Sequence, residues 1–137
     1  MTNLNFSMSE LIYSDTAIKN NINNMPDINS LDNILNLIVF CLQPIREKFG
    51  PIKVTSGYRC SKLNKLVGGQ INSNHLFGNA ADIIPLKANF KQVYDFITNN
   101  LEYDECFIET NKQGVKWLHI AYRKNTNRKK HNSNYLA

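Results

Sequence analysis

Two histidines and an aspartate stand at positions that suit a catalytic metal site. His75 and Asp82 lie seven residues apart in one polar stretch, and His119 follows much later in the chain. Imidazole nitrogens and a carboxylate oxygen bind Zn²⁺ at about 2.0–2.2 Å, and three such ligands leave a fourth position open. A zinc ion held this way polarises a carbonyl group and lowers the pKa of bound water to about 7. These residues predict a zinc hydrolase.

The spacing of these residues demands a turn. At about 3.3 Å per extended residue, His75 and Asp82 are too far apart to be neighbouring ligands on a straight strand. A turn at Gly78 would bring them together, and tertiary structure must supply His119. The alternative is a hydrogen-bonded surface histidine and an aspartate that caps a turn. Composition and spacing alone leave both interpretations open.

The elements that must position these residues follow from apolar periodicity and from turn residues. Helical spacing predicts a core helix from Ser30 to Phe49, with a kink or break at Pro44. Further helices are predicted to open at Ser7 with a capping box to Glu10, to span 61–67, and to run from Asn89 to Asn100. Strands are predicted at 52–56, 80–84, 105–110 and 115–122, the last two forming a hairpin around the turn 111–114. We expect one α+β domain at 1–122, with helices packed on one face of a small, mostly antiparallel sheet.

The charge is concentrated at the C-terminus. The net charge is +5, and residues 123–131 contain five Lys and Arg residues and no acidic residue. An anionic partner is plausible, either nucleic acid or the acidic polymers of a bacterial cell wall. Nucleic acid is not expected, because no aromatic residues alternate with the basic ones. We predict that 123–137 is a basic, flexible tail, with a weak electrostatic anchor as the alternative.

Several protein classes are disfavoured by the remaining features. The three cysteines, Cys41, Cys60 and Cys106, have no CxxC spacing and predict free thiols rather than a disulfide framework. The N-terminus lacks the basic and apolar regions of a signal peptide. No window approaches 18 consecutive apolar residues, so no membrane span is expected.

Three motifs carry a resemblance to a known family. Ser56–Arg59 reads SGYR, Ser73–Asp82 contains SxHxxGxAxD, and Trp117–His119 reads WxH. Together they resemble the zinc D-Ala-D-Ala carboxypeptidases and L-alanyl-D-glutamate endopeptidases. That family includes vancomycin-resistance-type and phage endolysin peptidases, and its fold is shared with hedgehog domains. The resemblance extends over roughly residues 6 to 122.

The resemblance implies roles for five residues. His75, Asp82 and His119 would be the zinc ligands. Arg59 would hydrogen-bond a developing oxyanion or a substrate carbonyl, with a structural ion pair as the alternative. Ser73 would contact the substrate, unless it caps its own loop.

The general base departs from the family pattern. Many relatives place a glutamate three residues before the last histidine, where this chain has Lys116. We predict that Glu109, expected opposite Lys116 across the hairpin, is the base; the alternative is a surface Glu109–Lys116 pair. Glu102, Asp104 and Glu105 are weaker candidates for the base.

The leading hypothesis is a zinc metallopeptidase that cuts peptidoglycan stem peptides, at a terminal D-Ala or at the L-Ala–D-Glu bond. A phage endolysin or virion component would fit, made in the bacterial cytoplasm without a signal peptide and acting at the wall after release. The alternative is a non-catalytic structural or assembly protein of a phage particle that keeps the fold.

Overall fold

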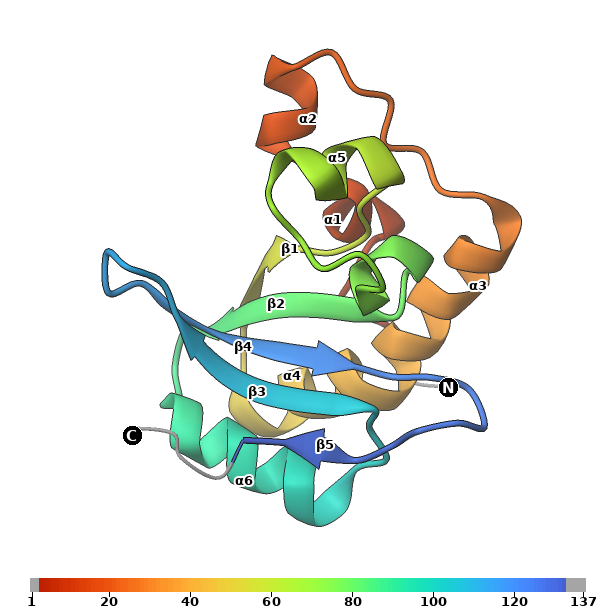
Figure 1. Cartoon of the computed structure of the whole chain (residues 1–137). Helices are drawn as coiled ribbons and strands as arrows, with labels where there is room; N and C mark the ends of the chain where they lie inside the picture. The colour runs from red at the N-terminus through yellow and green to blue at the C-terminus, as the bar shows by residue number, and fades with distance from the viewer. Residues whose placement is uncertain (1–2, 133–137) are drawn as a thin grey trace.

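The computed structural model describes residues 3–132 and shows a sheet with helices packed against it (Figure 1). Within these residues the strands are β1 (Ile52–Ser56), β2 (Ala80–Pro85), β3 (Glu105–Thr110), β4 (Lys116–Ala121) and β5 (Lys130–His131). Their spatial order is β1-β2-β4-β3-β5. Every pairing is antiparallel except β3 with β5. The predicted α+β class and mostly antiparallel sheet are confirmed.

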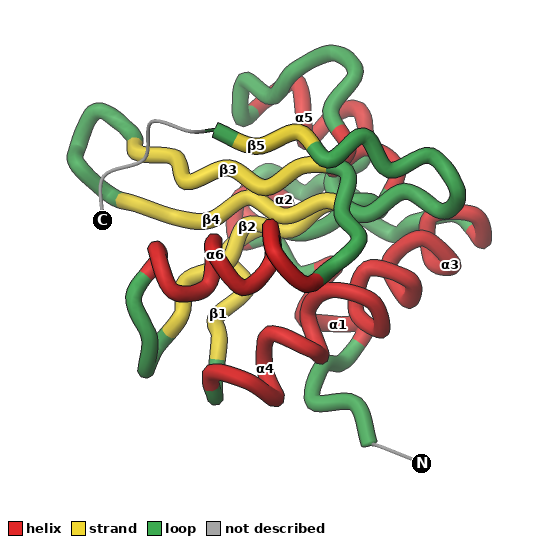
Figure 2. The backbone as a smooth tube through the Cα atoms, turned by 90° about the horizontal axis from the view of Figure 1, so that it is seen from below, coloured by secondary structure: helices red, strands yellow, loops and turns green. Residues whose placement is uncertain are grey.

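The helices form two groups. The long helices α3 (Ile28–Leu37), α4 (Gln43–Phe49) and α6 (Phe90–Asn100) contribute to the main core, and α6 crosses one face of the sheet in Figure 2. The short helices α1 (Met8–Ile12), α2 (Asp15–Lys19) and α5 (Ser61–Leu66) gather at the top of Figure 1, beyond β1 and β2. The predicted capping box at the start of α1 is present, and Asn89, the predicted start of α6, forms a second capping box with Gln92.

The predicted core helix is continuous from Ile28 to Phe49, although Pro44 leaves its mark. A π-helical turn, η1 (Ile38–Leu42), joins α3 to α4 immediately before the proline. Proline cannot donate a backbone hydrogen bond and clashes with the carbonyl four residues earlier, so a wider turn accommodates it without ending the helix. The expected interruption is therefore a π turn, and the chain stays helical to Phe49.

One face of this long helix builds the core. Its buried apolar residues are Ile34, Leu37, Ile38, Cys41, Leu42 and Ile45. By length and composition alone the 22-residue stretch Ile28–Phe49 is long and apolar enough to cross a membrane. The six buried residues instead belong to the hydrophobic core that the helix shares with the sheet and the other helices, so the stretch is weak evidence for a membrane span.

The β3–β4 hairpin is present, with a register one residue away from the predicted one. Glu109 pairs with Trp117, and Thr110 pairs with Lys116. Residues 111–115 connect the two strands, and the Asn111 N–H bonds the Val115 carbonyl at 3.0 Å, which continues the same register toward the turn. The expectation that Glu109 lies opposite Lys116 is therefore wrong, and the cross-strand Glu109–Lys116 pair is not formed by this register.

The predicted basic tail divides at residue 132. Residues 123–132 return along β3, where Glu105 pairs with Lys130 and Cys106 with His131. The side chain of Asn132 bonds the backbone of Ile108 in both directions, at 3.1 and 2.8 Å. This part of the segment is thus packed on the sheet rather than projecting from it. The remainder of the predicted tail, 133–137, lies outside the described residues.

Candidate metal centre

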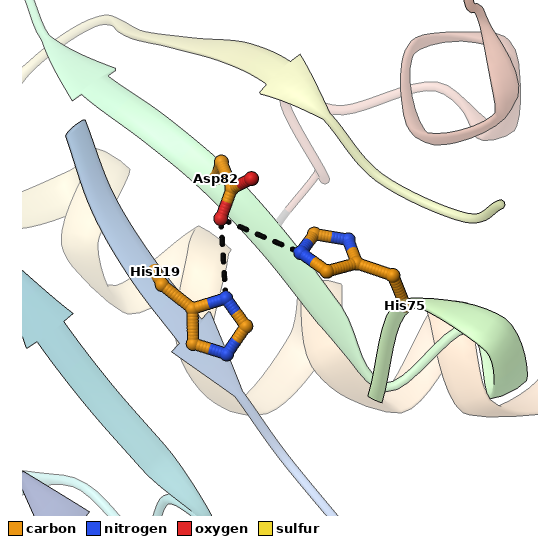
Figure 3. A group of neighbouring side chains, drawn as sticks. All are labelled: His75, Asp82 and His119. Atoms are coloured by element: carbon orange, nitrogen blue, oxygen red, sulfur yellow. Dashed lines mark hydrogen bonds and ion pairs between the residues drawn. The ribbon is translucent and has the colours of Figure 1, made fainter. Parts of the chain in front are cut away.

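The three predicted ligands converge at one point (Figure 3). Asp82 and His119 are directly opposite one another in the β2–β4 pair, and His75 approaches from η2 (Asn74–Phe77). Asp82 Oδ1 is 3.4 Å from His75 Nε2 and 3.1 Å from His119 Nδ1. One donor atom from each residue lies within 4.8 Å of the others. The fold therefore brings together two segments that are 37 residues apart.

The turn that folds His75 back toward Asp82 is a short 3₁₀ helix ended by Gly78. Gly78 has a φ of 77°, in the left-handed region that favours glycine. A Cβ atom at this position would lie 2.5 Å from the Ser30 carbonyl oxygen and 2.9 Å from Ile34 Cγ1. Both the dihedral angle and the close approach to α3 therefore require glycine at the turn, where the sequence predicted one.

Each imidazole has one nitrogen held by a neighbour and the other facing Asp82. His75 Nδ1 is 2.7 Å from the Gly57 carbonyl oxygen, to which it donates, and this leaves Nε2 as the acceptor. His119 Nε2 is 2.8 Å from Glu105 Oε1, and this leaves Nδ1 toward Asp82. Metal-ligating histidines typically donate their second nitrogen in this way.

Glu105 is thus part of the site in a role that sequence reasoning missed. From the sequence, Glu105 is a weaker candidate for the base, whereas in the structure it orients the ring of His119. Strand alternation held the relevant signal, because residues 105, 107 and 109 share one face of β3. Phe107 lies opposite His119 and stacks on its ring, with centroids 5.7 Å apart. His119 is consequently fixed from three sides.

The donor set fits a tetrahedral metal such as zinc. Ligand atoms about 2.0–2.1 Å from one zinc ion in tetrahedral geometry are roughly 3.3 Å apart, close to the two distances measured from Asp82 Oδ1. His75, Asp82 and His119 are 3%, 9% and 9% exposed, so the site is shielded from bulk water. Two nitrogens and one oxygen would leave one coordination position for water or substrate.

Electrostatics favours a cation among these groups. Burial alone would raise the pKa of Asp82, but its interactions with the His119 and His75 side chains hold the pKa well below its usual range. Burial alone would lower the pKa of His119, but Asp82 and Glu105 raise it to about 9. The two carboxylates thus stabilise positive charge at the imidazole. A divalent metal would supply that charge in place of the proton.

Arg59 lies at the edge of the same centre. Its Nε donates to Ser56 Oγ at 3.2 Å, its Nη1 donates to Asn64 Oδ1 at 2.9 Å, and its Nη2 is 3.8 Å from Asp82 Oδ2. Burial lowers the pKa of its guanidinium, while Asp82 and Glu109 raise it. The two neutral acceptors fix the guanidinium plane, and the loose contact with Asp82 leaves donors directed at the site.

A cavity of about 290 Å³ adjoins the three donors and is lined in part by Arg59, Ser73, Glu109 and Trp117. The hydroxyl of Ser73 accepts the His75 N–H at 3.1 Å, so Ser73 does cap its own loop. Because Ser73 also lines the cavity, the contact between Ser73 and the substrate stays a prediction.

Comparison with known protein families agrees with this geometry. Residues 4–121 match the family described as Peptidase M15. The chain belongs to this family. This match confirms the family resemblance noted in the sequence. M15 peptidases are zinc-dependent metallopeptidases. No curated protein matches the chain.

The hairpin register determines which acidic residue of this M15 chain faces the metal centre. Glu109 lies on the same face as His119 and contributes to the cavity wall. Its Oε1 accepts the Trp117 indole N–H at 3.0 Å. Lys116, at the position where many relatives have glutamate, lies instead over the Phe90 ring at 5.9 Å. Its ammonium group is therefore directed toward α6, on the other face of the sheet, and does not oppose the metal charge.

Proposed function

We propose that this M15 protein is a zinc-dependent peptidase that hydrolyses peptidoglycan stem peptides, at a terminal D-Ala or at the L-Ala–D-Glu bond. One observation carries the proposal. The three donors His75, Asp82 and His119, a carboxylate at Glu109 and a guanidinium at Arg59 all line one cavity. Amide hydrolysis needs these parts together: a site for an electrophilic metal, a proton acceptor and a cationic hydrogen-bond donor.

The side chains would divide the reaction between them. Zinc, when bound, would polarise the scissile carbonyl and make water nucleophilic near neutral pH. Glu109 would accept a proton from the attacking water and deliver it to the amine nitrogen as the C–N bond breaks. Arg59 would donate hydrogen bonds to the carbonyl oxygen as it gains negative charge. Ser73, beside His75, would bind the peptide backbone or carboxylate of the substrate.

The substrate class is supported by family membership and by charge. The family resemblance connects the SxHxxGxAxD and WxH motifs to enzymes that cut wall peptides. The net charge of +5 would favour approach to a wall rich in acidic polymers. We propose that the protein is made in the bacterial cytoplasm and acts at the bacterial cell wall. It would reach the wall either after release, as a phage endolysin, or as a component of the virion.

A digestion assay tests the function. Purified walls of several bacteria are incubated with zinc-loaded protein, and the released peptides are identified by mass spectrometry. New amino termini at D-Glu, or free D-Ala, would identify the bond, and the His75→Ala variant should release neither. Zinc-loaded wild-type protein that releases no stem peptide from any wall would contradict catalysis. That result would favour the alternative, a structural or assembly protein of a phage particle that keeps the fold.

A further inference from the structure

Asp104, next to the metal centre, is a fully buried carboxylate with 0% exposure. Its Oδ1 accepts the backbone N–H and the Nε–H of Arg128 at 3.0 and 2.9 Å, and its Oδ2 accepts from Nη2 at 2.7 Å. Arg123 Nε is farther away, at 4.0 Å. A buried carboxylate is tolerated only when it is paired and hydrogen-bonded. Arg128 is therefore the principal counter-charge of Asp104.

The hydrogen bonds around Asp104 continue to the metal ligand His119. Asn74 Nδ2 donates to Asp104 Oδ2 at 2.9 Å and to Glu105 Oε1 at 2.8 Å, which uses both of its amide hydrogens. Arg128 Nη2 also approaches Glu105 Oε2 at 3.4 Å. Glu105 Oε1 in turn holds His119 Nε2 at 2.8 Å. One connected set of contacts thus links Arg128 to the ligand.

Arg128 belongs to a segment that lies beyond the family match, which ends at residue 121. The segment is anchored on the strand that carries Glu105. Lys129 N–H bonds the Tyr103 carbonyl at 3.1 Å, and Lys130 N–H bonds the Asp104 carbonyl at 2.9 Å. The backbone that directly follows the arginine is therefore fixed beside the residues that its side chain contacts, Asp104 and Glu105.

We propose that Arg128 is a positioning residue for the metal ligand His119. By neutralising Asp104 and holding Glu105, with Asn74 between them, it fixes the carboxylate that accepts the His119 Nε2–H. That bond leaves His119 Nδ1 as the metal-binding nitrogen. The segment 123–132 accordingly supports the metal centre by positioning a ligand, which is a different role from that of a surface anchor. This inference rests on the proposed zinc site.

The test measures zinc affinity directly, by competition with a chromophoric chelator at fixed pH. Arg128→Met should weaken zinc binding about tenfold, the lower end of the effects seen when partners of metal ligands are removed. Lys129→Met is the matched control. It removes the same charge one residue away, where the ammonium contacts Glu102 at 3.5 Å, and it should leave zinc affinity unchanged.

A second variant separates positioning from stability. Arg128→Met leaves Asp104 buried without its counter-charge and should destabilise the fold. Asp104→Asn combined with Arg128→Met removes that charge as well and should recover thermal stability, while zinc affinity stays reduced. Imidazole ¹⁵N NMR of the zinc-loaded protein should show a protected His119 Nε2–H in the wild type and faster exchange of that proton in both variants.

The outcomes are distinguishable. Wild-type affinity in Arg128→Met, or recovery of both stability and affinity in the double variant, would overturn the positioning role and leave the zinc site intact. Failure of the wild-type protein itself to bind zinc would overturn this inference together with the proposed function.

Discussion

Glu109 and Trp117 face each other across the β3–β4 hairpin, and the indole N–H donates to Glu109 Oε1 at 3.0 Å. Both side chains also line the cavity beside the metal centre. The tryptophan of the WxH motif therefore holds the candidate base by this hydrogen bond. This relationship makes the role of Trp117 testable through Glu109.

Replacing Trp117 with phenylalanine should keep an aromatic ring but remove the hydrogen bond to Glu109. We expect kcat to fall about three- to tenfold with little change in KM, because one hydrogen bond contributes on the order of 1 kcal/mol. Steady-state kinetics on a stem-peptide substrate measures both values. In the Glu109→Gln background, Trp117→Phe should cause no further fall in kcat. Additive losses of kcat would show that Trp117 acts independently of Glu109.

Glu109→Gln should lower kcat by about 10²–10⁴-fold, the usual contribution of a general base. Zinc content should remain that of the wild type, because Glu109 is not one of the three donors. Glu102→Gln is the matched control, since its carboxylate contacts Lys129 rather than the centre. Unchanged hydrolysis by Glu109→Gln would rule out this residue as the base.

Lys116→Glu restores the acidic residue that many relatives carry, and it should not rescue Glu109→Gln. Lys116 lies over Phe90 on the α6 side of the sheet, so a glutamate there would point away from the cavity. Activity of the double variant on the stem-peptide substrate decides this point. Recovery of hydrolysis would mean that the hairpin shifts register to bring residue 116 to the metal.

His75→Ala should abolish stoichiometric zinc, with affinity reduced by more than about 100-fold, beyond the range seen for partners of ligands. Mass spectrometry of metals in the dialysed protein gives the content. His131→Ala provides the control, because this remaining histidine contacts Tyr103 away from the three donors. Equal zinc in both variants would contradict the assigned ligand set.

Gly78→Ala should destabilise the fold by about 2–4 kcal/mol, combining the cost of a left-handed alanine with overpacking against α3. Gly68→Ala separates the two contributions. Gly68 has a similar φ of 75°, but an added Cβ would meet nothing within 4 Å. We therefore expect its loss to be only about 1–2 kcal/mol. Urea denaturation measures both, and equal losses would refute the close contact at Gly78.

Asp104 predicts a component of acid sensitivity. Burial raises the pKa of Asp104, but the hydrogen bonds from Arg128 and Asn74 lower it by a larger amount. The folded-state pKa therefore lies below the ordinary value of 3.8. Ionised Asp104 therefore stabilises the fold fully above pH 3.8, and this contribution is lost as pH falls through the depressed pKa.

The matched comparison is wild type against Asp104→Asn, both metal-free, in urea titrations from pH 7 to pH 2. The variant should be less stable at pH 7, and the difference in free energy of unfolding should shrink in acid as wild-type Asp104 becomes neutral. A difference that stays constant across this range would contradict the assignment.

Local rules predicted most of the elements. Helical spacing located the core helix, and capping residues placed the starts of α1 and α6. Alternation located β1, a buried apolar run located β2, and the turn residues 111–114 located the β3–β4 hairpin. The predictions failed where distant contacts decide. The hairpin register depends on a loop closed by Asn111 and Val115, and β5 exists because residues 130–131 find an open edge of β3. The two residues of β5 are too few to give a periodic pattern in the sequence, so this strand could not be predicted.

The sequence by itself determined the chemical parts: two imidazoles, one carboxylate and a guanidinium in recognisable motifs, a second carboxylate at Glu109 outside them, and glycine at the turn that needs it. Tertiary structure decided their partners. Only the packed sheet places Glu109 on the face of His119 and directs Lys116 to the other face. The same packing pairs His119 Nε2 with Glu105. It also brings Arg128, from the segment predicted to be a flexible tail, to the buried Asp104. Motifs specify residue types, whereas which atoms face each other depends on strand register and on the need to pair every buried charge.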